Sequence, residues 1–187
     1  MTRIIALGDS HLQRLGARAG MLACAEHTGD VEVLNVAVGG STTADLAGQM
    51  DRSRPGRGDR VLISVGTNDA ASWYPVEQPL AESLLAAALE SLAAGGVERA
   101  VLLTSPGVDR ARLPQSNTRT ESDLRAFADA FTRVAAKTST LDVRVVDGQA
   151  VLGSLGVAAF CEDGMHLSAE GYDQLIPVLA AALCDAG

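Results

Sequence analysis

The chain has few aromatic residues, few histidines and no long hydrophobic run. Only 3% of the 187 residues are aromatic although 47% are hydrophobic, so the core must be built mainly from Ala, Val and Leu. A transmembrane helix needs about 20 consecutive apolar residues, and no stretch of that length is present. A membrane protein is therefore not expected.

Cysteines are also few. The three cysteines, Cys24, Cys161 and Cys184, lie far apart with no Cys-x-x-Cys pair, which argues against a disulfide framework or a zinc site and favours a reducing compartment. An apolar strand begins within three residues of the N-terminus, leaving no room for a secretory signal. We expect a cytoplasmic protein, although a chain whose leader had been removed would look the same.

Positive charge is scarce as well. The formal net charge is −8 and no basic run offsets it, so nucleic acids and anionic membrane surfaces are disfavoured as partners. The length suits one domain spanning residues 1–187, long enough to bury a sizeable core. A small-molecule substrate is the partner that remains, and the oligomeric state is left open.

Short β-branched runs alternate with longer segments of helical periodicity. The predicted strands span residues 3–8, 31–38, 60–65, 100–104 and 143–146, and the predicted helices span residues 12–28, 43–50, 79–94, 120–137 and 169–183. This alternation is typical of βαβ units. It predicts a three-layer α/β/α sandwich around a flavodoxin-like, five-stranded parallel sheet covered on both faces.

Two of the predicted loops are longer than βαβ units require. Residues 66–78 and 105–119 both follow strands, so both should lie at the carboxyl edge of the sheet, where open α/β folds bind ligands. We expect them to form the walls of a site.

Ser10 follows the first predicted strand, in Gly8-Asp9-Ser10. A strand-to-helix turn would present the hydroxyl at the carboxyl edge of the sheet, together with free N–H groups of the first helical turn. These groups suit a nucleophile and a developing oxyanion. The alternative is that Ser10 is simply a helix N-cap.

Gly40 and Asn68 follow the next two predicted strands. The glycine would let a backbone N–H approach a ligand closely, or would merely satisfy a tight turn with positive φ. The asparagine could donate to an oxyanion, or cap its own turn. Each position taken alone favours the structural alternative.

Asp163 and His166 are three residues apart, just before the last predicted helix, for which Ser168 is the expected N-cap. At this spacing the carboxylate can hold one ring nitrogen and leave the other facing the sheet edge, as a histidine base requires. An incidental surface ion pair is the alternative. Since no second His or Cys lies at ligand spacing from His166, no metal is expected.

Together these motifs resemble the SGNH hydrolase superfamily, which includes the GDSL esterases and lipases, over nearly the whole chain. Gly8-Asp9-Ser10 matches the nucleophile motif, and Gly40, five residues after Asn35, matches the oxyanion glycine. Gly66-Thr67-Asn68-Asp69 matches the oxyanion asparagine motif, and Asp163-Gly164-Met165-His166 matches the motif before the last helix.

The resemblance implies a serine esterase that needs no metal or organic cofactor. Ser10 would be the nucleophile, His166 its base and Asp163 the residue that orients the base. The oxyanion would be bound by the N–H groups of Ser10 and Gly40 and by the side chain of Asn68.

The chain departs from the family pattern at His11, where a leucine is usual. A second imidazole beside the nucleophile could contact the leaving group or alter the pH response. The alternative is a partly exposed residue on the first helical turn.

The two long loops supply further candidate substrate-lining residues. They are Trp73, Tyr74, Arg110 and Arg112. The aromatic pair could line an acyl or sugar pocket or simply anchor its loop. The arginines, with Arg119 in the same loop, could meet an anionic substrate or form a solvated surface.

Three functions stay open at this point. The first is hydrolysis of a carboxylic ester carrying a short acyl group on a small soluble compound, such as an acetylated sugar or another metabolite. The second is acyl transfer from the same acyl-enzyme to an alcohol. The third is a non-catalytic, flavodoxin-like module that binds phosphate at the Ser10 turn.

Overall fold

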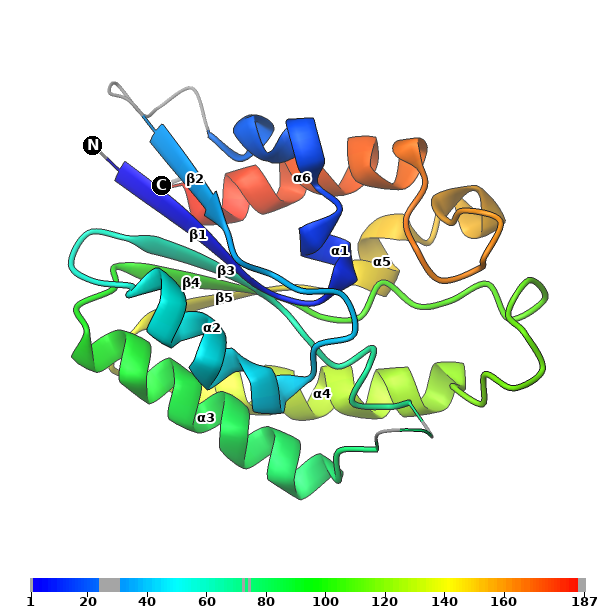
Figure 1. The fold of residues 1–187 in the computed structure, drawn as a ribbon, viewed down its shortest axis with the longest axis horizontal. Helices are drawn as coiled ribbons and strands as arrows, with labels where there is room; N and C mark the ends of the chain where they lie inside the picture. Colours follow the sequence, from blue (N-terminus) through cyan, green and yellow to red (C-terminus); the bar gives the residue numbers. More distant parts are fainter. Residues whose placement is uncertain (1, 24–30, 72, 74, 185–187) are drawn as a thin grey trace.

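The sheet consists of five parallel strands in the order β2-β1-β3-β4-β5 (Figure 1). The strands are β1 (Thr2–Gly8), β2 (Val31–Asn35), β3 (Arg60–Ser64), β4 (Arg99–Leu103) and β5 (Asp142–Val146). This computed structural model describes residues 2–23, 31–71, 73 and 75–184. The strand order confirms the predicted flavodoxin-like sheet.

Helices cover both faces of the sheet (Figure 1). One face carries α2 (Leu46–Ser53), α3 (Gln78–Ala94) and α4 (Glu121–Lys137), with the short 3₁₀ helix η2 (Thr43–Asp45) leading into α2. The other carries α1 (Ser10–Gln13), α5 (Gly148–Leu152), α6 (Ala169–Leu183) and the 3₁₀ helices η1 (Gly16–Leu22) and η3 (Gly156–Ala159). The three-layer sandwich is therefore confirmed.

Alternate residues of the central strands pack into two separate hydrophobic cores, one on each face of the sheet. On β1, Ile5 and Leu7 pack with α2, α3 and α4, whereas Ile4 and Ala6 pack with α1, η1 and α6. Successive side chains of a strand point to opposite faces, and a parallel sheet covered on both sides needs apolar residues at every position. This requirement explains the unbroken apolar run of β1.

The predicted helix over residues 12–28 is wrong. The chain forms the four-residue α1 and then the 3₁₀ helix η1, and residues 24–30 lie outside the described part. Gly16 has φ +52°, a left-handed conformation that cannot continue a right-handed α-helix. The short elements α5 and η3 were not predicted.

The cysteines also differ from the prediction. Cys161 is a free thiol, but Cys184, directly after α6, is disulfide-bonded. The expectation of a chain without disulfides therefore fails at Cys184, and with it the argument for a reducing compartment. No helix among the described residues is long and apolar enough to cross a membrane.

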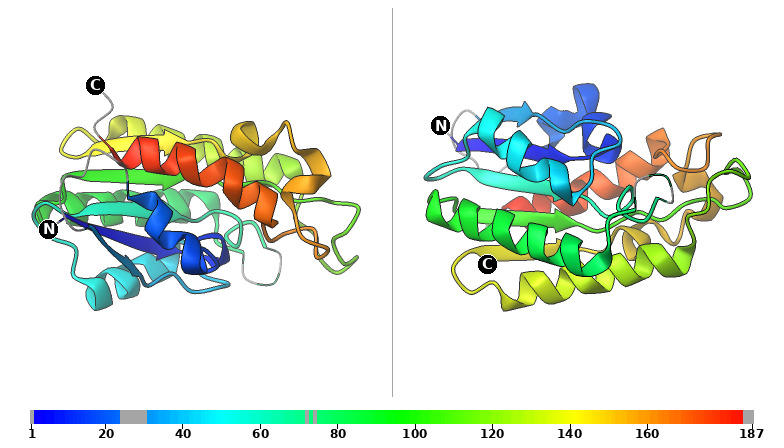
Figure 2. Two further views of the ribbon diagram at one scale, coloured as in Figure 1. Left: turned by 90° about the horizontal axis from the view of Figure 1, so that it is seen from above. Right: turned by 60° about the horizontal axis from the view of Figure 1, so that its bottom comes forward.

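Two loops project together beyond the carboxyl ends of the strands (Figure 2). They are the segment between β4 and α4 and the segment between η3 and α6, joined where the Asp109 N–H donates to the Gly164 carbonyl over 2.7 Å. Ser168 ends the second loop as the predicted N-cap of α6, accepting from the Gly171 N–H. Of the two long loops that the sequence predicts at this edge, the loop over residues 105–119 thus lies there.

Candidate active site

The turn after β1 depends on glycine. Gly8 has φ +120°, and a Cβ there would lie 1.9 Å from the Ser64 carbonyl oxygen of the neighbouring strand. The Gln49 side chain, from α2, accepts from the Gly8 N–H and donates to the Gly8 carbonyl, over 2.5 and 2.9 Å. The chain therefore leaves β1 along a path fixed by both backbone and side-chain contacts.

Ser10 is the first residue of α1, and the N-cap is Asp9, whose Oδ1 accepts from the His11 N–H. The alternative reading of Ser10 as the cap is therefore wrong. Its hydroxyl has no hydrogen-bond partner among the described residues, and the N–H of a first-turn residue has no acceptor within its own helix. Both groups are available to a ligand.

The loop after β2 passes directly beside Ser10. A Cβ on Gly39 would lie 3.6 Å from the Ser10 Cβ. Gly40, the next residue, is exposed and has φ +84°. The positive φ meets the turn requirement, and the position beside Ser10 also presents the backbone of this loop to the same space.

The Asn68 side chain connects this loop to the end of β3. Its Nδ2 donates to the Ser41 carbonyl over 3.0 Å, and its Oδ1 accepts from Arg119 Nη2 over 2.8 Å. The amide therefore bonds to two other segments and does not cap its own turn. An amide nitrogen carries two N–H donors, so one remains for a ligand.

Asp69, the last residue of the same motif, has a structural role that the sequence did not indicate. It is buried, its Oδ1 accepts from the N–H and hydroxyl of Thr43 over 3.0 and 2.6 Å, and its Oδ2 accepts from the Gly66 N–H over 2.9 Å. It thereby ties the turn after β3 to the start of η2.

Asp163 and His166 form a fixed pair. Asp163 Oδ2 lies 2.6 Å from His166 Nδ1, and Asp163 Oδ1 accepts from the N–H groups of Met165 and His166 over 3.0 and 2.9 Å. Burial raises the pKa of Asp163, but its hydrogen bonds to His166 and Met165 outweigh this and bring the pKa to about 2. The carboxylate is thus ionised, and three hydrogen bonds make it more than an incidental surface pair.

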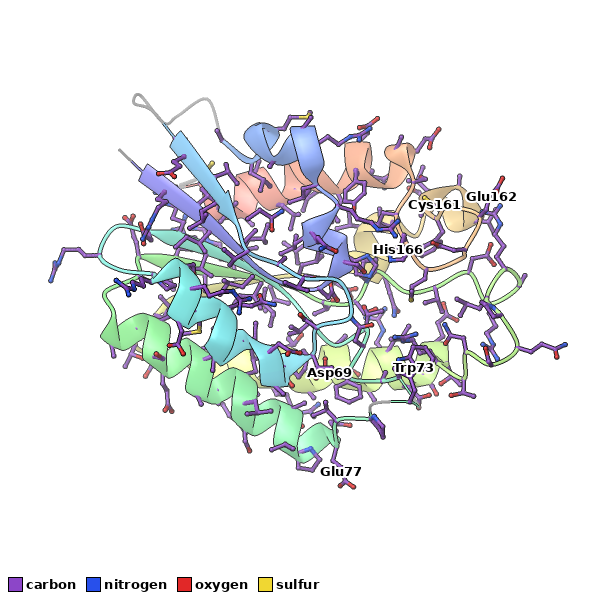
Figure 3. The ribbon with its side chains drawn as sticks, in the orientation of Figure 1. Asp69, Trp73, Glu77, Cys161, Glu162 and His166 are labelled. Carbon is purple, nitrogen blue, oxygen red and sulfur yellow. The ribbon has the colours of Figure 1, made fainter. Side chains whose placement is uncertain are left out.

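His166 lies near enough to His11, the residue after Ser10, to contribute to the lowered pKa of His11. Figure 3 shows His166 on the α1 side of the carboxyl edge, with Asp69 and Trp73 on the other side. No hydrogen bond joins Ser10 to His166 here. Such bonds are often long in ligand-free enzymes and tighten when substrate binds.

His11 is almost fully buried, with 1% of its surface exposed. The reading of His11 as a partly exposed residue is therefore wrong, and it does not line an open pocket. Its Nε2 lies 3.4 Å from the Thr67 hydroxyl. Burial, followed by the charges of His166 and Arg119, lowers the pKa of His11 to about 3, so the ring is neutral.

The candidate residues of the long loops have different surroundings. Arg112 pairs with Asp109 over 3.1 Å and donates to the carbonyl of Phe160, while Arg110 donates to the Asn117 carbonyl. Both arginines are exposed and hold loop segments together.

The other loop candidates divide between surface and interior. Trp73 is 52% exposed, whereas Arg119 is completely buried, so the reading of a solvated basic loop is wrong at Arg119. Tyr74 lies outside the described residues. Across the described part of the chain, no group of three or more His, Cys, Asp or Glu side chains is placed to hold a metal ion.

The sequence profile of the GDSL-like Lipase/Acylhydrolase family matches residues 6–174. No curated protein matches the chain in sequence.

Several solved structures share this fold. A lipase/acylhydrolase from Enterococcus faecalis has a TM-score of 0.73 at 19% identity, over 97% of this chain and 94% of that one. A member of the lipolytic protein G-D-S-L family from Veillonella parvula has a TM-score of 0.72 at 16% identity, over 100% of both chains. A GDSL-like lipase from Bacteroides thetaiotaomicron has a TM-score of 0.68 at 16% identity, over 97% and 87%.

Proposed function

Because this chain belongs to the GDSL-like lipase/acylhydrolase family and is thus an ester hydrolase in general terms, we propose that it is a serine esterase acting through a Ser10 acyl-enzyme. The observation that carries the proposal is the Asp163–His166 pair, held at 2.6 Å, in a chain whose Ser10 hydroxyl has no hydrogen-bond partner among the described residues. The whole sequence, 1–187, would form one hydrolase domain.

In the first half-reaction, Ser10 Oγ attacks the ester carbonyl while His166 Nε2 accepts the hydroxyl proton. Asp163, hydrogen-bonded to Nδ1, holds the ring in the tautomer that leaves Nε2 free, and stabilises the imidazolium. His166 then protonates the departing alcohol. In the second half-reaction it deprotonates water, which attacks the acyl-serine and releases the acid and the free Ser10 hydroxyl.

The developing oxyanion would be bound by the N–H groups of Ser10 and Gly40 and by Asn68 Nδ2. The loop beside Ser10 and the hydrogen bond from Asn68 to Ser41 support this assignment, because they join the three donors' segments into one region. Losing one such donor costs roughly 10²–10³ in kcat.

For the substrate, we propose an ester of a short acyl group on a small soluble compound, with an acetylated sugar as one example. Among the described residues of the loops 66–77 and 105–119 there is no apolar helix of the kind that would serve as a lid at a lipid interface. The half-exposed Trp73 supplies an aromatic surface at the rim.

The test is hydrolysis of p-nitrophenyl acetate by the wild type and by Ser10→Ala, with Ser83→Ala, an exposed serine on α3, as the matched control. We expect Ser10→Ala to lose activity with an unchanged circular dichroism spectrum, and Ser83→Ala to keep it. Full activity in Ser10→Ala would exclude the mechanism. Added alcohols report whether acyl transfer competes with hydrolysis.

A further inference from the structure

Arg119 is a buried cation just before α4, and it contacts Asn68, the candidate oxyanion donor. Its Nε donates to the Thr67 carbonyl over 2.6 Å, and its Nη2 donates to Asn68 Oδ1 over 2.8 Å. The guanidinium also lies over the Trp73 ring, 4.4 Å from Cζ to the ring centroid. Arg119 is thus held against the loop after β3 by three contacts, to Thr67, Asn68 and Trp73.

Among the described residues, no ion pair explains the burial of the Arg119 charge. Removing a guanidinium from water costs several kcal/mol unless a partner compensates. Within the described chain, Arg119 has no carboxylate within salt-bridge distance, and its Nη1 is buried without a hydrogen-bond partner. Burial accordingly lowers the pKa of Arg119, although the charge of Asp9 opposes the shift. The contacts that Arg119 does make are directed at Thr67, Asn68 and Trp73.

The chemistry of the two partners decides how the Asn68 amide must point. A guanidinium has donors only, so the atom facing Arg119 must be the amide oxygen. A carbonyl accepts only, so the atom facing Ser41 must be the amide nitrogen. With both contacts made, the amide has one orientation, and the Nδ2 group lies on the side of the Gly39-Gly40-Ser41 loop.

We propose that Arg119 is a positioning residue: it fixes the Asn68 amide with its N–H groups toward the oxyanion, and Trp73 holds the guanidinium in place from the solvent side. The positive charge at Oδ1 also polarises the amide, which strengthens Nδ2–H as a donor. Arg119 itself does not touch the reacting atoms. This inference rests on the proposed function, since it specifies how one oxyanion donor is held.

The test is a double-mutant cycle on ester hydrolysis. Arg119→Met, which keeps the length and loses every donor, should lower kcat by about 10–100-fold and leave KM within about threefold, because an interaction made in the transition state is weakened. Arg119→Lys keeps the charge but not both donor contacts, so its kcat should lie between those of Arg119→Met and the wild type.

The decisive comparison is made in the Asn68→Ala background. If Arg119 acts through Asn68, Arg119→Met adds no further loss of kcat there; if the two losses multiply, the inference is overturned. Arg133→Gln, an exposed arginine on α4, is the control and should leave kcat unchanged. A wild type without esterase activity would instead contradict the proposed function.

A second variant covers the event that Arg119→Met does not fold. Trp73 is half exposed, so Trp73→Ala removes the ring that covers Arg119 without opening the core. Trp73→Ala should lower kcat by about 3–10-fold, because one oxyanion donor is held less firmly. In the Asn68→Ala background the same substitution should not lower kcat further. Unchanged kcat in Trp73→Ala would overturn the inference. Trp73 is also the single tryptophan of the chain, so its emission should change in Arg119→Lys if the two groups stack.

Discussion

Asp9→Asn should change how the stability of the protein depends on pH. Asp9 is fully buried beside the nucleophile candidate; its Oδ1 accepts from the His11 N–H and the Ser64 hydroxyl, and its Oδ2 has no partner. Burial raises the pKa of Asp9 from 3.8 to about 7, although these two hydrogen bonds oppose the shift. The folded protein therefore keeps a proton that the unfolded chain releases.

The sign of the effect follows from the raised pKa. The protonated carboxyl contributes stability that is fully present below pH 3.8 and is lost as the pH rises through about 7. The difference between the two pKa values corresponds to about 4 kcal/mol of unfolding free energy. Asp9→Asn removes this loss, so the variant should gain about 4 kcal/mol relative to the wild type between pH 4 and pH 8.

His11 changes the pH dependence of stability in the opposite direction to Asp9. This increases the expected difference in slope between Asp9→Asn and the wild type. Its pKa falls from 6.5 to about 3, mainly through burial, so its contribution to stability is present above pH 6.5 and is lost as the pH falls through about 3. In the wild type the Asp9 and His11 contributions therefore oppose each other between about pH 4 and 6.5. Asp9→Asn should rise in stability with pH over this range.

Urea unfolding followed by circular dichroism at pH 4, 5, 6, 7 and 8 measures the difference. Asp129→Asn, an exposed carboxylate on α4, is the matched control and should run parallel to the wild type. If the buried amide of Asp9→Asn lowers the unfolding free energy by the same amount at every pH, its curve of unfolding free energy against pH is shifted without a change of slope. Parallel curves for Asp9→Asn and the wild type would contradict the raised pKa of Asp9.

Three further variants test the support of the site. Gln49→Leu leaves the Gly8 N–H without its acceptor, whereas the Gly8 carbonyl still accepts from the Val38 N–H. The variant should lose about 1–3 kcal/mol of unfolding free energy in urea; a change below about 0.5 kcal/mol contradicts this. Gly8→Ala puts a Cβ 1.9 Å from a backbone oxygen, so this variant should not yield folded protein. The control Gly48→Ala, at an exposed position of a helix, should unfold at or above the wild-type melting temperature. A wild-type melting temperature for Gly8→Ala would contradict this prediction. Asp163→Asn should lower kcat by about 10²–10⁴-fold with little change in KM, because the ring loses its fixed tautomer; retained kcat would argue against the orienting role.

The sequence predicted the sheet and the long helices because their periodicity is strong and their ends are marked by local signals. The failure over residues 12–28 has a local cause, since apolar spacing persists there while Gly16 takes a left-handed conformation. The five-residue α5 was missed because so short a helix shows little more than one turn of periodicity.

The site was predictable to a different degree. Its motif residues could be located because each follows a strand or precedes the last helix. The burial of His11 and Arg119, and the contacts of Gln49 and Asp69, depend on which segments meet in space. No local sequence pattern shows which segments meet in space, so the sequence predicted a solvated arginine at position 119 where the structure has a buried one.

The role of Ser10 as nucleophile is tested most directly by the mass of the intact protein after incubation with a fluorophosphonate, followed by peptide mapping. We expect one adduct per chain, located on Ser10, with its rate of formation reduced in His166→Ala and no adduct formed in Ser10→Ala. An unmodified wild type, or an adduct on another residue, would contradict the claim that Ser10 is the nucleophile.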